Sequence, residues 1–212
     1  MPPLYTLADS TVGAALRLGW RPVVEGLDAV PRQGGVLLAA NHSSIADQLF
    51  LGSVLPRHVA FWAKSEYFTA GGPWGRLTRA VLHGLGAIPV DRSGGGAADS
   101  AFAAAVPVLR GGGVVAVFPE GTRSPDGRLY RGRTGTVRLA RGAGVPVVPV
   151  GITGTAAVRP GRPRPGTVGL RFGPPLDVGS GDVRTATDAL MAAIRELSGQ
   201  EYVPHYAPRR AA

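Results

Sequence analysis

The sequence places a histidine and an aspartate, His42 and Asp47, five residues apart in the segment NHSSIAD (residues 41–47). On one continuous helix, side chains five residues apart point roughly 140° away from each other. They meet only if His42 lies in a loop and Asp47 in the first turn of a helix. The carboxylate then binds one imidazole nitrogen and leaves the other as a general base. Ser44 and Asp47 also have the spacing of a helix-capping pattern, so a catalytic and a structural interpretation both stay open for this segment alone.

No residue suited to covalent catalysis accompanies this pair. The sequence contains no cysteine and no Gly-x-Ser-x-Gly elbow, which are common sources of an acyl-enzyme intermediate. If His42 is a base, the proton that it removes most simply belongs to a hydroxyl group of the substrate. The four histidines show no metal-ligand spacing such as His-Glu-x-x-His, so we predict that the protein holds no metal.

A second polar segment, FPEGTRS (residues 118–124), follows an apolar run. Gly121 admits close backbone approach, while Thr122 and Arg123 offer hydrogen-bond donors to a phosphate. The overlapping letters SPDG form a turn in their own right, which is the structural alternative. A third segment, GAIPVDR (residues 86–92), ends in Asp-Arg before a run of glycines and is a weak signal taken alone.

Short apolar runs alternate with helical stretches along the chain. We predict strands at residues 36–40, 58–63, 86–90, 113–118, 145–150 and 167–172, and helices at residues 45–55, 74–84, 98–109, 134–141 and 183–197. This alternation predicts an α/β fold, a single-domain sandwich with a largely parallel or mixed central sheet flanked by helices. The first two polar segments both follow predicted strands, and the carboxyl ends of strands are where such sheets bind ligands.

Three other stretches carry expectations of their own. Leu77, Val81 and Leu85 recur four residues apart, which predicts an apolar stripe facing the core. The first helix suits either contact with a membrane surface or packing on the core, and the letters RPGRPRP (residues 159–165) predict an exposed loop. We therefore divide the chain into an N-terminal helix, a main domain and a C-terminal tail: residues 1–19, 20–200 and 201–212. Within the tail, we expect residues 204–212 to be frayed.

The charge of the chain points to anionic partners. Its formal net charge is +9, and all but one of its 23 basic residues are arginines, the exception being Lys64. Such a surface attracts phosphates, acidic lipids or nucleic acid. Arginines gather between Arg123 and Arg141, but with Tyr130 as the one aromatic residue among them. Because single-stranded nucleic acid favours interleaved aromatics, a phosphate or an anionic membrane surface is the better match.

Taken in order, these segments resemble the four blocks of the glycerolipid acyltransferases of the 1-acyl-glycerol-3-phosphate acyltransferase family. The likeness runs from about residue 20 to residue 172. The similar segments are NHSSIAD for the His-x4-Asp block, GAIPVDR for Gly-x-Ile-x-x-x-Arg, FPEGTRS at every position, VPVVPV (residues 145–150) for the closing block, and AKSE (residues 63–66) for a Lys-x-Glu segment. The resemblance implies a glycerol-3-phosphate acyltransferase-like fold.

The resemblance also implies an activity. His42 would deprotonate the free hydroxyl of 1-acyl-glycerol-3-phosphate, with Asp47 orienting the imidazole. The oxygen would then attack the thioester of acyl-CoA or acyl carrier protein directly and give phosphatidic acid, with no metal and no bound cofactor. The residues that would hold the acceptor are Lys64, Arg92, Glu120, Gly121, Thr122 and Arg123. The residues that would support the site are Asn41, Ser44, Gly86, Pro119 and Pro149, the last of these at the floor of the site.

Many members of that family carry long N-terminal membrane segments, whereas residues 4–20 are the one candidate here. We therefore expect peripheral attachment to an anionic membrane at its cytoplasmic face, without a transmembrane span. One alternative keeps the chemistry and changes the acceptor to another lysophospholipid, a glycolipid or a lipoamino acid. Another is a catalytically silent protein that binds lipid or nucleic acid. The intact His42 and Asp47 argue against silence, and we expect no nucleic-acid partner.

Overall fold

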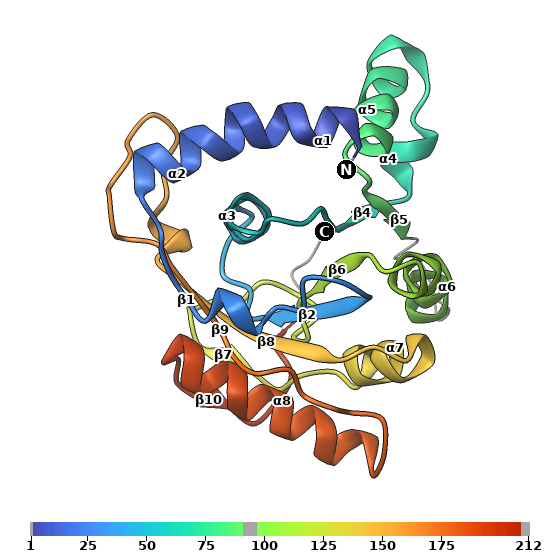
Figure 1. Cartoon of the computed structure of the whole chain (residues 1–212), viewed down its shortest axis with the longest axis vertical. Coiled ribbons are helices and arrows are strands. Elements are labelled where there is room, and N and C mark those ends of the chain that lie inside the picture. Colours follow the sequence, from blue (N-terminus) through green and yellow to red (C-terminus); the bar gives the residue numbers. More distant parts are fainter. Residues whose placement is uncertain (1, 91–96, 209–212) are drawn as a thin grey trace.

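The computed structural model of the chain describes residues 2–90 and 97–208 (Figure 1). Its centre is a six-stranded sheet in the order β1-β9-β8-β2-β6-β3. Every neighbouring pair in it is parallel except β8 and β9, which are antiparallel. The predicted mixed α/β sandwich is therefore confirmed.

The strands are β1 (Val23–Glu25), β2 (Val36–Ala40), β3 (Val59–Ala60), β4 (Trp62–Lys64), β5 (Ile88–Val90), β6 (Val114–Val117), β7 (Leu129–Tyr130), β8 (Val147–Thr153), β9 (Gly169–Phe172) and β10 (Tyr202–Val203). The helices are α1 (Pro3–Ala8), α2 (Ala14–Trp20), α3 (Ala46–Val54), α4 (Glu66–Thr69), α5 (Gly72–Gly84), α6 (Ala97–Arg110), α7 (Gly135–Ala143) and α8 (Val183–Ser198). A π-helical turn (Asp9–Gly13) joins α1 to α2, and short 3-10 turns lie at Leu27–Ala29 and Thr155–Ala157.

The central strands are buried on both faces, which explains why their sequences are apolar without alternation. In β2, Leu37 and Ala39 pack into a core that α6, α7 and α8 cover. Leu38 and Ala40 point the other way, into a second core shared with α3 and α2. Figure 1 shows these two helical layers on opposite sides of the sheet.

Two of the predicted strands differ from the observed ones. The run at residues 58–63 is divided between β3, which pairs with β6 in the central sheet, and β4, which does not. Instead, β4 pairs with β5 in a separate two-stranded ladder. The Gly86–Val90 region therefore lies beside the central sheet rather than within it.

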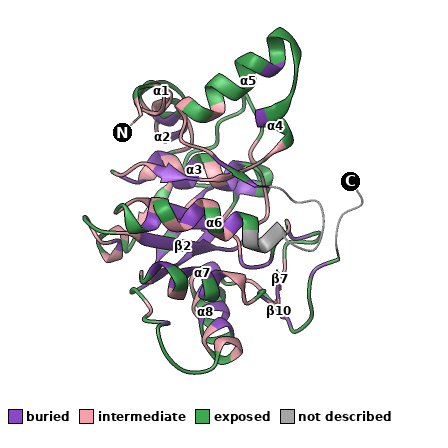
Figure 2. Ribbon diagram, turned by 90° about the vertical axis from the view of Figure 1, so that its right-hand side faces the viewer, coloured by how far each residue is buried: buried purple, intermediate pink, exposed green. Residues whose placement is uncertain are grey.

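The predicted core-facing stripe on α5 is wrong. Leu77 is 53% exposed and Trp74 is 80% exposed, and Val81 is exposed as well. Gly75 is the one residue of α5 that is buried. Figure 2 shows the helix projecting from the molecule with most of its surface in solvent. Helical periodicity identified the stripe but not what lies opposite it, because no other element covers this face.

The predicted fraying of residues 204–212 is wrong for residues 204–207, which continue from a short strand that docks on β7. β10 pairs in parallel with β7, so Tyr202 lies opposite Leu129 and Val203 opposite Tyr130. The pairing continues where the Arg131 amide donates to the carbonyl of His205 at 3.1 Å. Val203 and Ala207 are buried with Tyr130 in a small separate cluster. The segment is too short and too polar for its sequence to have indicated this docking.

The N-terminal helix packs on the core along one side, as one of its two interpretations predicts, and exposes apolar residues on the other. Leu16 is buried against the α3 side of the sheet, and the Tyr5 hydroxyl donates to the Gly52 carbonyl of α3 at 3.2 Å. Leu7 and Leu18, by contrast, are well exposed. None of the described helices combines the length and the apolar character that crossing a bilayer requires. The loop at residues 159–165 is exposed, as predicted.

Candidate active site

The carboxyl ends of β2 and β6 bring the two main polar segments together. These strands are parallel neighbours, so the residues that follow them leave the sheet at the same edge. The Ser124 amide donates to the His42 carbonyl at 2.7 Å. The His42 ring stacks on Phe118, with the ring centroids 3.9 Å apart and the planes 14° from parallel. The FPEGTRS segment therefore forms one wall around the histidine.

His42 and Asp47 form the pair that the sequence predicts. His42 lies in the loop after β2 and Asp47 in the first turn of α3, and Nδ1 of the imidazole is 2.8 Å from Oδ2 of the carboxylate. The amides of Ser43 and Ser44 donate to the same oxygen at 2.8 and 2.9 Å. Asp47 therefore holds the backbone at the start of the helix and orients the imidazole at once, so the structural interpretation is confirmed and the geometry is compatible with the catalytic one.

This geometry determines which imidazole nitrogen is available to act as a base. An ionised Asp47 keeps the proton on Nδ1 and leaves the lone pair on Nε2. Among the described residues, Nε2 of His42 has no hydrogen-bond partner. The second carboxylate oxygen, Oδ1, is buried without a partner in the same part of the chain. The pair is therefore built to accept a proton at Nε2 and to stabilise the resulting imidazolium.

Asn41 and Ser44 hold the loop in place. The Asn41 amide group donates to the Ile152 carbonyl at 2.8 Å and accepts from the Ile152 amide at 2.7 Å. Its side chain thus forms the pair of hydrogen bonds that a neighbouring strand would form, and it holds the loop against β8. The Ser44 hydroxyl accepts from the Ala46 amide at 3.2 Å. Both residues therefore hold the backbone of the loop that carries His42.

Glu120 has a different position from the one expected of a residue that contacts the acceptor. Its side chain is 1% exposed, and both carboxylate oxygens accept backbone amides: Oε1 from His42 at 3.1 Å and Oε2 from Tyr130 at 2.9 Å. Burial raises the pKa of Glu120 to about 7, and the two amides oppose that rise. Glu120 therefore joins the histidine loop to β7, and its burial keeps its side chain out of reach of a substrate.

Of the residues after Glu120, Gly121 and Arg123 are exposed and Thr122 is half-buried. Gly121 has φ +75°, a backbone conformation that favours glycine. A methyl group there would lie 2.9 Å from Nε of Arg133. Arg123 is exposed, and within the described residues it forms no ion pair. In the same part of the chain, the amides of Thr122 and Arg123 have no acceptor. These groups form a row of free donors beside the histidine.

The remaining residues that were predicted to form the site either contact other parts of the fold or are not among the residues that the structure describes. Pro119 is buried, and its carbonyl accepts the Arg133 amide at 2.8 Å. Gly86 has φ +68°, and a methyl group there would lie 2.4 Å from the His58 ring. Pro149 lies in the middle of β8 and its carbonyl accepts the amide of Gly173 at 2.9 Å, so it shapes the sheet. Lys64 belongs to β4 but its side chain lies outside the description, as does Arg92 altogether.

A comparison with protein families identifies the chemistry of this arrangement. A family model described as "Acyltransferase" matches residues 21–153, more than half of the chain. The matched region contains both the His42–Asp47 pair and the FPEGTRS segment. The chain belongs to the acyltransferase family. The resemblance seen in its motifs is therefore confirmed, and the protein is an acyltransferase enzyme.

Individual relatives agree with the family. The chain is 29% identical over 156 residues to a Bacillus subtilis protein named 1-acyl-sn-glycerol-3-phosphate acyltransferase, covering 73% of each chain. It is 35% identical over 146 residues to a protein of the same name from Limnanthes alba, covering 65% of this chain but 49% of that one. A crystal structure of the 1-acyl-sn-glycerophosphate acyltransferase PlsC from Thermotoga maritima superposes with a TM-score of 0.64 at 26% identity, covering 91% of this chain and 82% of the other.

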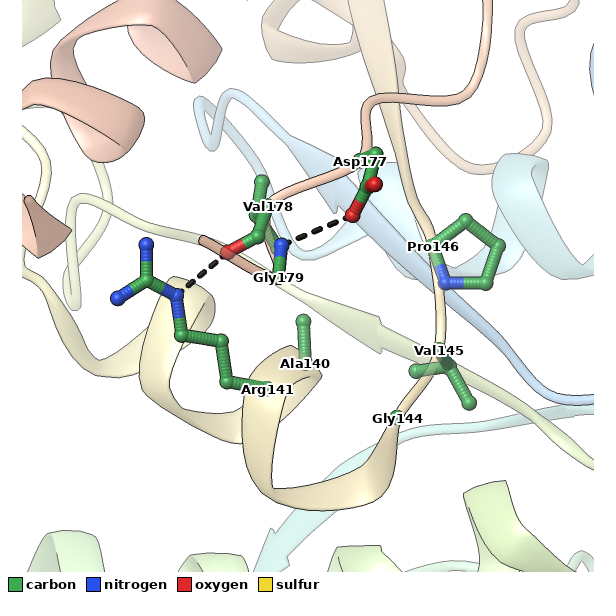
Figure 3. A pocket seen from close by; sticks show the side chains of 8 residues that line it. All are labelled: Ala140, Arg141, Gly144, Val145, Pro146, Asp177, Val178 and Gly179. Atoms are coloured by element: carbon green, nitrogen blue, oxygen red, sulfur yellow. Dashed lines mark hydrogen bonds between the residues drawn. The ribbon is translucent and has the colours of Figure 1, made fainter. Parts of the chain in front are cut away.

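The arginines of this acyltransferase do not act as one patch. Arg128 pairs with Asp126 at 2.7 Å. Arg141 donates to the carbonyls of Val178 and Ser180. Figure 3 shows the Arg141–Val178 bond at the edge of a cavity of about 360 Å³ near the amino end of β8. The predicted cluster is thus divided, since at least these two arginines have internal partners.

Two features near the site were not predicted from the sequence. Ile45, directly before α3, and Leu49 on α3 are exposed next to the histidine loop. Their four-residue spacing was visible, but their exposure was not. Arg133 lies beside Gly121 because β7 brings it there, and no motif singled it out. Within the described residues, no group of three His, Asp or Glu side chains is placed to hold a metal ion.

Proposed function

We propose that this acyltransferase transfers a fatty acyl group from acyl-CoA or acyl carrier protein to the free hydroxyl of 1-acyl-glycerol-3-phosphate. The product is phosphatidic acid. The names of the relatives support this acceptor. The single observation that carries the mechanism is the 2.8 Å contact between Nδ1 of His42 and Oδ2 of Asp47, which leaves Nε2 free as a base.

The reaction follows from that geometry. Nε2 of His42 removes the proton of the acceptor hydroxyl as the oxygen attacks the thioester carbonyl carbon. Asp47 stabilises the imidazolium that forms. The tetrahedral intermediate then breaks its carbon–sulfur bond, and the thiolate that leaves takes the proton from Nε2. The ester and the free thiol are released, and the histidine returns to its starting state without an acyl-enzyme.

The acceptor phosphate fits the donors beside the histidine. Arg123 and the free amides of Thr122 and Arg123 offer charge-assisted hydrogen bonds to a phosphate monoester. We assign Lys64 and Arg92 to the same role on the strength of the family resemblance. We do not include Glu120 among the substrate contacts, because its side chain is buried and bound to two backbone amides.

We further propose that the enzyme works at a membrane surface. Exposed apolar side chains occur on or next to three helices that lie toward the same side of the molecule (Figures 1 and 2): Leu7 on α1, Ile45 directly before α3, Leu49 on α3, and Trp74 and Leu77 on α5. Exposed apolar groups gathered in this way are typical of interaction sites. An acceptor that carries a fatty acyl chain resides in a membrane, so the enzyme must reach the membrane surface to bind it.

One assay tests the proposal. Purified protein is given acyl-CoA or acyl carrier protein with a panel of lysolipid acceptors, and the products are identified by mass spectrometry. We expect acylation of 1-acyl-glycerol-3-phosphate, and a loss of about 10²- to 10⁴-fold in His42→Ala. The control is His83→Ala, an exposed histidine of α5, which keeps its activity. Acylation restricted to acceptors without a phosphate would overturn the choice of acceptor, and near-normal turnover in His42→Ala would overturn the mechanism.

A further inference from the structure

The C-terminal segment places an aromatic ring against two arginines next to the proposed acceptor site. The guanidinium carbon of Arg133 is 4.9 Å from the ring centroid of Tyr206, and that of Arg131 is 5.6 Å from the same centroid. Both distances are within the range of a cation–π interaction. The β7–β10 pairing fixes this arrangement, because it docks residues 202–207 beside the strand that leads to Arg133.

Arg133 is joined to the FPEGTRS segment by two contacts. Its amide donates to the Pro119 carbonyl at 2.8 Å, and its side chain occupies the space beside Gly121, where a methyl group would lie 2.9 Å from Nε. Glu120, between those two residues, accepts the backbone amide of His42. The Arg133 side chain thus lies beside Gly121, the residue that follows Glu120, and Glu120 holds the loop that carries His42.

The charges around this ring are not neutralised. Among the described residues, no carboxylate lies within ion-pair distance of Arg123, Arg131 or Arg133. A ring face compensates a guanidinium only in part, so an anion is the natural partner for the free donors. Arginine also suits this task, because its planar fork binds two oxygens of a phosphate at once.

We propose that Arg133 binds the phosphate of the acceptor together with Arg123, and that Tyr206 is the positioning residue that orients Arg133. This inference rests on the proposed function and adds to it a residue outside the family motifs and a role for the C-terminal segment. Tyr206 acts through the Arg133 guanidinium and does not itself contact the substrate. Removing its ring therefore leaves the phosphate contact available but less well oriented.

The test compares two acceptors that differ only in the phosphate, 1-oleoyl-glycerol-3-phosphate and 1-oleoylglycerol, in neutral detergent micelles. We expect Arg133→Gln to raise KM for the phosphorylated acceptor about 10-fold or more, with kcat changed less than about 3-fold. Turnover of 1-oleoylglycerol stays at the wild-type level. Arg138→Gln, the same charge change on the exposed surface of α7, leaves both reactions unchanged.

The positioning role of Tyr206 has its own pair of variants. Tyr206→Leu keeps the bulk but removes the π face, and we expect it to raise KM for the phosphorylated acceptor about 3- to 10-fold. Tyr206→Phe keeps the ring and restores the wild-type KM. Thermal unfolding of each variant, with midpoints within about 3 °C of the wild type, shows that the fold is intact.

The outcomes separate this inference from the proposed function. An Arg133→Gln enzyme that behaves like Arg138→Gln overturns the phosphate contact while the proposed function stands. Equal KM values for Tyr206→Leu and Tyr206→Phe overturn the positioning role alone. A wild-type enzyme that prefers 1-oleoylglycerol overturns the proposed acceptor first, and the assigned phosphate site with it.

Discussion

At the scale of the residue, the catalytic loop depends on two carboxylates with different tasks. Asp47 faces the imidazole ring and orients it. Glu120 holds the backbone of the same histidine from the opposite segment, and also the backbone of Tyr130. A motif that contains a glutamate suggests a substrate ligand, but burial changes that role. The glutamate of the FPEGTRS segment therefore links this segment to the histidine loop and to β7.

The buried Glu120 makes stability depend on pH. Its pKa is raised from the ordinary value of 4.5 to about 7 by burial. As pH rises from 4.5 to 7, the unfolded chain loses this proton before the folded one does, so the folded state loses stability. The shift corresponds to about 3 kcal/mol of unfolding free energy over this window. Urea unfolding at pH 5, 6, 7 and 8 measures it.

The matched variant for this measurement is Glu120→Gln, which keeps the size and removes the titration. It is less stable at pH 5, because the NH₂ group of glutamine cannot accept one of the two backbone amides. The difference in unfolding free energy between the wild type and this variant narrows as pH rises. Parallel curves for the two proteins would show that Glu120 does not titrate in this range.

At the scale of the element, α5 packs against α4 and α1 but leaves an apolar face exposed. Trp74, Leu77 and Val81 occupy one face at spacings of three and four residues, and Arg76 and Arg79 lie on the other. An apolar face with an aromatic residue opposite a basic face is the pattern of a helix that lies in the interface of a bilayer. The helix also contacts α1 where Gly84 meets Leu4, so the two helices present one surface.

Replacing the α5 face is therefore expected to weaken membrane binding. Trp74→Ser with Leu77→Ser removes two apolar side chains, each worth about 1.5–3 kcal/mol when fully buried, so binding to vesicles falls by about 10-fold or more. Ala80→Ser, an exposed position off this face, is the control. Activity in detergent micelles is unchanged. If the double variant co-sediments with vesicles as strongly as the wild type does, α5 is excluded from the contact with the membrane.

These point changes are sharper than removal of the N-terminal helix. Deleting residues 1–19 would also take Leu16 out of the core and the Arg17 contact away from the Ser53 carbonyl. Lost binding after such a deletion would not separate a missing membrane contact from a damaged fold. Leu18→Ser tests the exposed side of α2 without that cost.

The elements show what the sequence could and could not predict. Buried strands such as β2 and β6 were visible because both of their faces are apolar. The two-residue strands β7 and β10 were not, because backbone pairing at that length leaves no pattern in side chains. In the site, local spacing identified His42 with Asp47. Arg133 stayed hidden, since its neighbour Tyr206 is distant in sequence and only the fold joins them.

At the scale of the whole molecule, charge and apolar surface would contribute separately to the membrane binding that we propose. The net charge is +9, yet several arginines are held internally, as Arg57 is by the carbonyls of Pro31, Gly34 and Gly112. The free arginines therefore act as a long-range field that attracts anionic lipid. Apolar side chains on α5 act only on contact.

Salt distinguishes these two contributions. The Debye length falls from about 10 Å at 0.1 M salt to about 3 Å at 1 M, so attraction between the basic surface and anionic lipid is screened while apolar insertion is not. We expect binding to vesicles rich in phosphatidylglycerol to fall by about 10-fold or more between 50 and 500 mM NaCl. Binding to phosphatidylcholine vesicles is weaker and changes little. The Trp74→Ser, Leu77→Ser variant loses affinity by a similar factor at both salt concentrations, because its change is apolar. Equal salt dependence on both lipids would mean that the net charge plays no part in bringing the enzyme to its acceptor.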